Sequence, residues 1–444
     1  MIMRWKNAGP KTNLFKNARW LLIPAVLAAG AWLWIVKFES EKPAVRLLRD
    51  GPALGRELSL RFEDRKSGLA RIRVEADQAG RTVELLSEEF PEPVASVEKT
   101  ISLRPLPAGL TDGEIVLRIA ASDHSWRKGN AAVWEMRKII DTRPPRMTFL
   151  GGPHSIAPGG AGVVSFMLDE SAALSGLQAG NSFFPAYEAG GGRYFVWYAL
   201  PCDAPPDVPF IGVAEDEAGN RTNVHFRPDV KSVRVNSDIL TLTDAFFEGV
   251  VPYFKSLDPS LKGTDLEIFL AVNRDQRARD DERLQAICRD TGPRPLWRGT
   301  FLRLPRSKTM AAFGERRTYL YNGREIDRQI HLGVDLASVR NCPVPAANAG
   351  RVVFAGPLGI YGETVILDHG CGLFSMYCHL SRIDAAVSSS VARGDVLGLS
   401  GATGMAGGDH LHFAMLVHGV FVDPVEWWDA RWIQNNVAIK MESE

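Results

Sequence analysis

Two histidines separated by one residue, His410 and His412, are the clearest candidates for chemistry in this chain of 444 residues. In a β-strand, residues two apart share a face, so these two imidazoles and Ala414 point the same way. The residues that alternate with them are apolar and predict a core face: Leu411, Phe413, Met415 and Val417. Two imidazoles beside a small residue therefore favour a site over packing.

Two further elements lie upstream, His331-Leu-Gly-Val-Asp335 and Tyr377-Cys-His379-Leu380. Zinc in hydrolases usually takes three protein ligands from His and Asp or Glu and keeps a fourth position for water. His331, Asp335 and one histidine of the 410/412 pair supply such a set, and the ion would lower the pKa of its water to about 7. His379 and the other member of the pair would then move protons. The alternative is that these residues serve separate surface or packing roles.

Cys378 precedes His379, which raises the alternative of a Cys–His hydrolase. Strand alternation places this thiol on the face opposite His379 and the two polar residues Ser375 and Tyr377, so we do not favour a cysteine nucleophile. No C-x-x-C pair occurs among the five cysteines, which leaves a thiolate zinc site without support.

The elements around these motifs predict a mostly β protein. Residues 43–142 and 143–235 each contain short apolar runs between Gly, Pro and Asp breaks, and a weak repeat relates Ile119–Asp123 to Ile211–Asp216. We expect two β-sandwich modules resembling immunoglobulin-like domains, serving as a spacer or binding arm that a regulatory protein partner would contact. One irregular β domain is the alternative.

Residues 238–292 predict a short helical segment, in which Thr264 and Glu267 have the spacing of a capping box. Residues 296–432 return to β signals with frequent glycines and form the last expected domain. The long Arg-rich segment Arg316–Gln329 precedes His331, and we expect either a groove wall or a plug there.

The N-terminus predicts a membrane anchor. Residues 1–19 carry basic residues and no acidic one, which indicates a cytoplasmic tail, and Trp20–Val36 is uncharged and flanked by tryptophans. Seventeen residues are at the short end of what spans a bilayer. We expect an inner-membrane protein whose later domains face the periplasm; a cleaved signal peptide is the competing interpretation. Lys+Arg and Asp+Glu are both 52, so no overall charge favours nucleic acid.

Three ordered motifs, His331–Asp335, Gly362–His379 and Gly394–Phe413, resemble the lysostaphin-type, or LytM-like, zinc endopeptidases over roughly residues 310–427. The resemblance implies a small antiparallel β fold with a groove and hydrolysis of peptides in bacterial peptidoglycan. It further implies the roles of five residues: zinc ligands His331, Asp335 and His412, and catalytic residues His379 and His410.

Two positions depart from the family pattern: Asp409 stands where Pro or a small residue is usual, and Ala414 where Glu is common. Neither removes a ligand, so we expect a membrane-anchored zinc endopeptidase that cuts peptidoglycan cross-links. Asp409 would tune His410 or lie exposed. The alternatives are a non-hydrolytic LytM-like regulator that activates other cell-wall hydrolases and, less favoured, a protease of a protein substrate.

Overall fold

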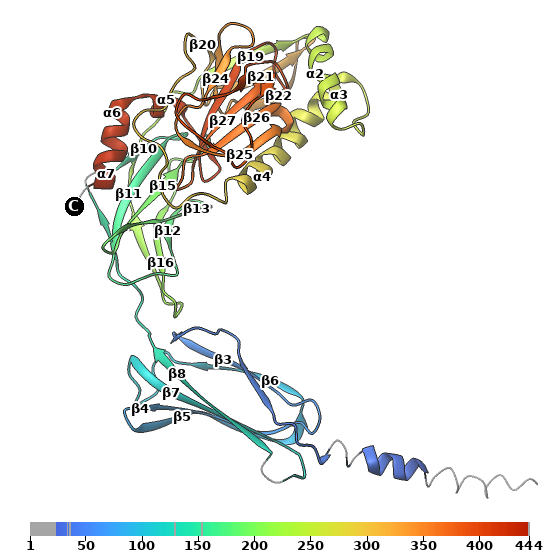
Figure 1. Cartoon of the computed structure of the whole chain (residues 1–444), viewed down its shortest axis with the longest axis vertical. Coiled ribbons are helices and arrows are strands. Elements are labelled where there is room, and N and C mark those ends of the chain that lie inside the picture. The colour runs from blue at the N-terminus through green and yellow to red at the C-terminus, as the bar shows by residue number, and fades with distance from the viewer. Residues whose placement is uncertain (1–23, 33, 35–36, 128–129, 152–153, 443–444) are drawn as a thin grey trace, which may run out of the picture. The chain divides into compact units, whose positions relative to one another are not determined.

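The computed structural model describes residues 24–32, 34, 37–127, 130–151 and 154–442. The chain divides into two compact units, residues 1–144 with 216–220 and residues 145–215 with 221–444. Each unit is described by itself below (Figure 1).

The predicted membrane anchor falls only partly on described residues. Residues 24–32 and 34 are helical, whereas residues 20–23, 33, 35 and 36 of the predicted span lie outside the described part of the chain. Within the described residues, no helix combines the length and apolar character needed to cross a bilayer.

The first unit consists of two β-sheets around one core. Strand alternation places Leu58, Leu60 and Phe62 in this core, all at most 1% exposed, and each such side chain contributes about 1.5–3 kcal/mol by burial. The sheets have the orders β1-β3-β6 and β2-β8-β7-β4-β5. The strands are β1 (Ala44–Leu47), β2 (Ala53–Leu54), β3 (Glu57–Glu63), β4 (Leu69–Gln78), β5 (Arg81–Val94), β6 (Ser96–Ser102), β7 (Gly113–Asp123) and β8 (Ala131–Ile140).

The second unit opens with two four-stranded antiparallel sheets, β14-β15-β11-β9 and β13-β12-β16-β17, and a short parallel pair, β10-β18. The mostly β character expected from the sequence is confirmed. These strands are β9 (Met147–Leu150), β10 (Ser155–Ile156), β11 (Ala161–Leu168), β12 (Leu174–Ala179), β13 (Ser182–Pro185), β14 (Tyr187–Gly190), β15 (Arg193–Ala199), β16 (Phe210–Glu215), β17 (Arg221–Phe226) and β18 (Asp229–Val230).

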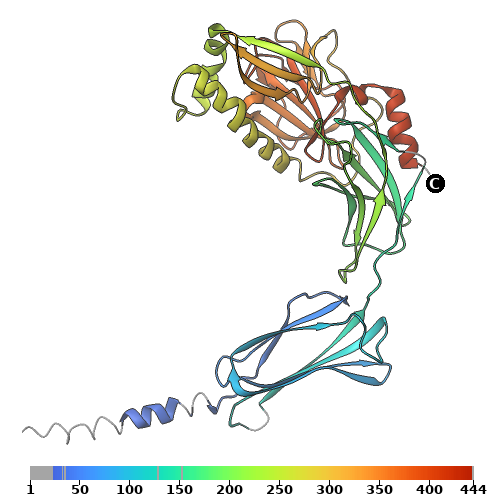
Figure 2. The ribbon, with the colours of Figure 1, turned by 180° about the vertical axis from the view of Figure 1, so that it is seen from behind.

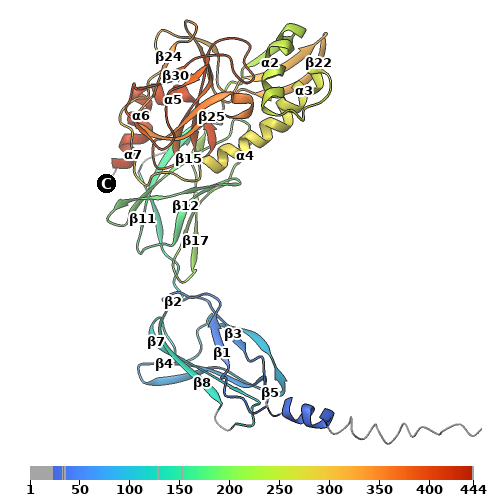
Figure 3. The same ribbon diagram turned by 45° about the vertical axis from the view of Figure 1, so that its right-hand side comes forward.

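A helical layer follows, entered through one strand, β19 (Ser237–Leu242). Thr264 accepts from the Glu267 backbone and the Glu267 carboxylate accepts from the Thr264 backbone, so the predicted capping box forms. The helix α4 runs beside the large sheet (Figure 2), and α2 and α3 lie next to β22 (Figure 3). The helices are α2 (Asp244–Leu257), α3 (Asp265–Ala271), the π-helical turn η1 (Val272–Gln276) and α4 (Arg277–Ile287).

The last part of the chain is built on an antiparallel eight-stranded sheet, β20-β23-β31-β27-β26-β25-β29, with β32 paired to β31. Smaller sheets, β19-β21-β22 and β24-β30-β28, flank it. Its strands are β20 (Lys308–Ala311), β23 (Val334–Ala337), β25 (Gly350–Pro357), β26 (Glu363–Asp368), β27 (Leu373–Leu380), β29 (Ser390–Val391), β31 (Leu411–Val417) and β32 (Val420–Val422). The remaining elements are β21 (Arg316–Tyr321), β22 (Arg324–Ile330), β24 (Pro343–Pro345), η2 (Gly359–Tyr361), β28 (Arg382–Ile383), β30 (Val396–Leu399), α5 (Pro424–Trp428), α6 (Ala430–Ile433), η3 (Gln434–Ala438) and α7 (Ile439–Glu442).

The two central strands of this sheet, β27 and β31, are covered on both faces. One face packs with β15, whose Trp197 meets Trp427 and Trp297 at ring-centroid distances of 5.5 and 6.2 Å. The other face packs against the helical layer. Sheet residues between two cores are held rigidly, which suits side chains that must keep a fixed geometry.

Candidate metal centre

Neighbouring strands bring three of the predicted residues together. Asp335 on β23 lies directly opposite His412 on β31, and His331 enters from the loop just before β23. His331 Nε2 is 3.0 Å from both Asp335 Oδ1 and His412 Nδ1, and His412 Nδ1 is 2.9 Å from Asp335 Oδ1. All three residues are at most 9% exposed.

These distances indicate a cation site. His331 Nδ1 donates to the carbonyl oxygen of Ala312 at 2.9 Å, so the neutral ring presents a lone pair at Nε2. Three acceptor atoms about 3 Å apart repel unless a proton or a metal ion lies among them. Two imidazole nitrogens and one carboxylate oxygen are a donor set typical of zinc sites with an open position. The residues present therefore fit a zinc ion.

Asp335 carries the negative charge of this cluster. Burial works to raise the pKa of its carboxyl, but the close contacts with the imidazoles of His331, His410 and His412 outweigh burial and hold the pKa far below the usual range. Arg317 also donates to its second oxygen at 3.1 Å. The carboxylate is therefore ionised and oriented from both sides.

The other two predicted residues lie beside this cluster. The His379 ring is 4.9 Å from that of His410 and 5.7 Å from that of His412, between centroids. His379 Nδ1 donates to the Thr403 carbonyl and His410 Nδ1 to the Gly408 carbonyl, both at 2.8 Å. In a neutral ring, each hydrogen bond fixes the proton on Nδ1 and leaves Nε2 as the acceptor. All five predicted residues line one cavity of about 450 Å³.

The face predicted for His379 is corrected by the structure. His379 has a φ of 60°, so regular alternation fails at this residue. Tyr377 and Ser375 lie on the other side of the sheet, where their hydroxyls hydrogen-bond to each other. Cys378 pairs directly with His412 and shares its side, contrary to our expectation. Burial raises the pKa of this thiol well above its ordinary value, which again disfavours a cysteine nucleophile.

Two contacts around the ligands were not found by sequence reasoning. A Cβ at Gly333 would stand 2.4 Å from His412 Nε2, so only glycine fits beneath this ring. Tyr361 lies 5.9 Å from the His412 ring, and its hydroxyl is buried. The glycine in the middle of His331-Leu-Gly-Val-Asp335 could have indicated the first contact. No sequence feature indicated the contact between Tyr361 and His412.

The structure shows where the Arg-rich segment and Asp409 lie. Residues Arg316–Gln329 form most of the hairpin β21–β22, and Arg317 and Tyr319 line the cavity as part of its wall. Asp409 accepts from the Ser400 hydroxyl at 2.6 Å and from the Asn341 backbone at 3.0 Å. It therefore ties together the loops that precede His410.

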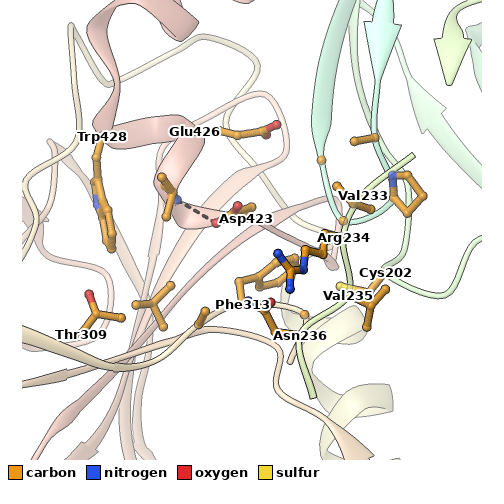
Figure 4. Close-up of a pocket in the computed structure, with 18 residues that line it drawn as sticks. Cys202, Val233, Arg234, Val235, Asn236, Thr309, Phe313, Asp423, Glu426 and Trp428 are labelled. Atoms are coloured by element: carbon orange, nitrogen blue, oxygen red, sulfur yellow. Dashed lines mark hydrogen bonds between the residues drawn. The ribbon is translucent and has the colours of Figure 1, made fainter. Parts of the chain in front are cut away.

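A second cavity, of about 310 Å³, is lined by residues that directly precede this segment, among them Thr309 and Phe313 (Figure 4). Ala312, whose carbonyl orients His331, is one of its lining residues, together with the neighbouring Phe313. On the opposite wall, Asp423 caps α5 through the Val425 backbone, and Glu426 accepts from the Ala161 backbone. Burial raises the pKa of Glu426 to about 8.

The sequence profile of peptidase family M23 matches residues 329–424. This stretch spans all five predicted site residues, His331, Asp335, His379, His410 and His412. Residues 329–424 are a peptidase M23 domain. The resemblance carried by the three sequence motifs is thereby confirmed, and the domain holds the His-Asp-His cluster typical of M23 metallopeptidases.

Curated relatives match this chain over short stretches. The chain is 37% identical over 97 residues to the DD-carboxypeptidase/endopeptidase Mpg of Neisseria meningitidis serogroup B, which is 22% of each chain. It is 37% identical over 89 residues to the peptidoglycan DD-endopeptidase ShyA of Vibrio cholerae, or 20% of this chain and 21% of that protein. The chain thus spans about a fifth of the length of these curated relatives.

A solved structure, the catalytic domain of the antimicrobial peptidase lysostaphin from Staphylococcus simulans, is 29% identical to this chain with a TM-score of 0.24. The comparison covers 28% of this chain and 94% of that one.

Proposed function

We propose that this chain is a zinc-dependent endopeptidase that hydrolyses peptide cross-links in bacterial peptidoglycan. The observation that carries the proposal is the meeting of two sets of residues in one cavity. His331, Asp335 and His412 supply a metal-binding donor set, and His379 and His410 present proton-accepting nitrogens beside it. The names of Mpg and ShyA support the substrate class.

The chain would hold the ion through His331 Nε2, Asp335 Oδ1 and His412 Nδ1. Zinc at this place supplies Lewis-acid chemistry, activating a water molecule and stabilising negative charge on the scissile carbonyl. Two of the three ligands are oriented by a partner: His331 by the Ala312 carbonyl, and Asp335 by Arg317. Such outer partners commonly change metal affinity or activity 10–100-fold when they are removed.

His379 and His410 would move protons. With Nδ1 donating to a backbone carbonyl, each ring accepts a proton at Nε2 and can return it to the leaving amine. The left-handed backbone of His379 is an uncommon conformation for a non-glycine residue and costs about 1–3 kcal/mol. The packing of the surrounding strands offsets this cost. The positive φ points the His379 ring toward His412 and away from the side that strand alternation would give it.

The remaining features of the proposal rest on sequence. Trp20–Val36 would anchor the chain in the inner membrane and send the M23 domain to the periplasm, where peptidoglycan lies. The two β modules, residues 43–142 and 143–235, would act as immunoglobulin-like spacers that a regulatory protein contacts. Fractionation of cells, followed by protease treatment of spheroplasts, tests the anchor: a C-terminal epitope tag should sediment with membranes and be degraded from outside.

Digestion of purified cross-linked peptidoglycan tests the activity. The zinc-loaded chain is incubated with this substrate, with and without a chelator, and released fragments are identified by mass spectrometry. We expect cross-linked dimers to be converted to monomers, with a fragment mass that shows cleavage of the D,D bond named in Mpg and ShyA. Full zinc occupancy without cleavage would contradict the enzyme and support the non-hydrolytic regulator.

A further inference from the structure

A second group of potential metal ligands lies in the first unit, outside the peptidase domain. One carboxylate oxygen from each of Glu39, Asp64 and Asp123 lies within 4.8 Å of the others. Glu39 precedes β1, Asp64 directly follows β3, and Asp123 ends β7. Glu39 and Asp64 are only 6% and 7% exposed. Three acidic residues from distant segments are thus gathered at one end of the module.

The charge of this cluster is not balanced within it. Glu39 Oε1 accepts from the Ser67 backbone, but Glu39 Oε2 is buried without a hydrogen-bond donor. The nearest ammonium, on Lys66, is 3.9 Å away and lies closer to Glu41, at 2.7 Å. An ionised oxygen buried in this way is costly unless a cation is bound to it. The hydroxyl of Ser67, a residue 1% exposed, is also buried without a partner.

Asp64 and Asp123 are held in place by their own loops. Asp64 Oδ1 accepts from the backbones of Lys66 and Gly68 at 3.1 and 2.8 Å. Asp123 Oδ1 accepts from the Ser125 backbone at 3.0 Å. Burial raises the pKa of Asp123, and the charges of Asp64 and Glu39 add to this effect. The loops therefore hold like charges close together.

The donor atoms of this cluster are all oxygens. Carboxylates without imidazole or thiolate select hard cations such as calcium and magnesium over zinc. Calcium takes six to eight oxygens in an adaptable geometry, whereas magnesium requires a near-ideal octahedron and usually keeps several waters. Three carboxylates on separate segments, with an unpartnered hydroxyl nearby, suit the larger and more adaptable ion.

We propose that Glu39, Asp64 and Asp123 bind one calcium ion. The ion would join the segment that enters the module to two of its loops. The backbone of this segment already contacts one of them: the Ser125 hydroxyl donates to the carbonyls of Lys37 and Glu39, and Trp126 N–H donates to that of Lys37. Calcium adds the Glu39 side chain to these contacts and thereby fixes the module to the chain that precedes it.

Calcium binding is measured on the full-length chain in detergent, with zinc already bound to the peptidase domain. Flow dialysis with radioactive calcium gives the stoichiometry, and scanning calorimetry gives the unfolding temperature of the first module. We expect one calcium ion per chain and a rise of about 4 °C or more at saturating calcium. The variant H331A, which lacks a zinc ligand, should bind the same single ion.

The decisive variant is E39Q, which keeps an oxygen to accept from Ser67 but lacks the charge. It should lose calcium binding and the calcium-dependent rise, and without calcium it should unfold at the parent temperature or above, because one of three like charges is gone. The matched control is E41Q, whose side chain is 70% exposed and lies outside the cluster; it should bind calcium as the parent does.

Four results would overturn the proposal. The first is absence of calcium binding by the parent at millimolar concentration. The second is a parent-like affinity in E39Q. The third is an E39Q variant destabilised equally with and without calcium, which would show a purely structural role for Glu39. An equal response to magnesium would overturn the choice of calcium.

Discussion

Two clusters of potential metal ligands, one in each compact unit, differ in their donor atoms and in their net charge. This difference suits the first to catalysis and the second to a structural role. The cluster His331–Asp335–His412 has two nitrogen donors and one carboxylate on or beside neighbouring β-strands. The cluster Glu39–Asp64–Asp123 has three carboxylates on or before loops. With a divalent ion bound, one carboxylate leaves the first cluster with a net positive charge, whereas three carboxylates leave the second with a net negative charge. Only the first can stabilise a developing oxyanion.

A partly buried carboxylate, Glu426, shows what happens without a cation. Glu426 on α5 accepts from the Ala161 backbone, and burial, together with the charge of Asp423, raises its pKa to about 8. Protonation therefore removes its charge, as a metal ion would for Asp335. Glu426 and Asp335 thus differ in whether a proton or a metal ion neutralises the carboxylate. Substitutions at single residues test this difference.

The largest effect is expected from the zinc ligands. His331→Ala or His412→Ala should abolish both zinc binding and peptidoglycan cleavage, because two remaining ligands do not retain the ion. Metal content is measured by mass spectrometry and cleavage by release of soluble fragments. Calcium binding by the first module should be unchanged in both variants, and its loss would contradict the independence of the two clusters.

The proton-transfer residues should separate activity from metal binding. His379→Ala or His410→Ala should lower turnover by about 10²-fold or more while zinc stays bound, since neither ring nitrogen belongs to the ligand triad. The same two assays apply. Zinc loss in His410→Ala with zinc retained in His412→Ala would show that the histidine pair is assigned backwards.

Close packing beneath His412 gives a smaller effect. Gly333→Ala would place a Cβ 2.4 Å from His412 Nε2 and displace this ligand, so zinc affinity should fall by about 10–100-fold. Gly249→Ala, in α2, is the matched control because nothing lies within 4 Å of its added Cβ. Equal zinc affinity in the two variants would refute the packing argument.

The smallest effect concerns stability and pH. Glu426 has a folded-state pKa of about 8 against an ordinary value of 4.5, so the folded protein holds a proton that the unfolded chain releases between these values. Its contribution to stability is present below pH 4.5 and is lost as pH rises through 8. Glu426→Gln, which stays neutral, should match the parent at low pH and be more stable at pH 8.

Thermal unfolding between pH 5 and 8 measures this difference. The exposed Glu248→Gln in α2 is the control and should follow the parent at every pH. A constant offset between Glu426→Gln and the parent would contradict the proton as the neutralising partner of this carboxylate.

The site was largely predictable because strand alternation and motif order determine most of it. The apolar face of residues 411–417 and the His331–Asp335 spacing both agree with the structure. The prediction from strand alternation was wrong at His379, because a residue with positive φ points its side chain to the opposite side. No local sequence feature indicates this backbone conformation. The helical segment begins with β19, whose partner β21 is more than seventy residues away.

The acidic cluster could not be predicted from the sequence, for a related reason. Glu39, Asp64 and Asp123 have no common spacing, and only the packing of three segments brings them together. Ligands on adjacent strands leave a readable pattern in the sequence, whereas ligands on remote loops leave none.

Separate addition of the two ions tests the central claim most directly. The full-length chain is stripped of metal, zinc and calcium are added back one at a time, and cleavage of cross-linked peptidoglycan is followed against the metal bound per chain. We predict that cleavage returns in proportion to zinc, reaches its maximum at one zinc per chain, and does not respond to calcium alone. Cleavage by the metal-free chain, or cleavage restored by calcium alone, would contradict a zinc centre at His331, Asp335 and His412.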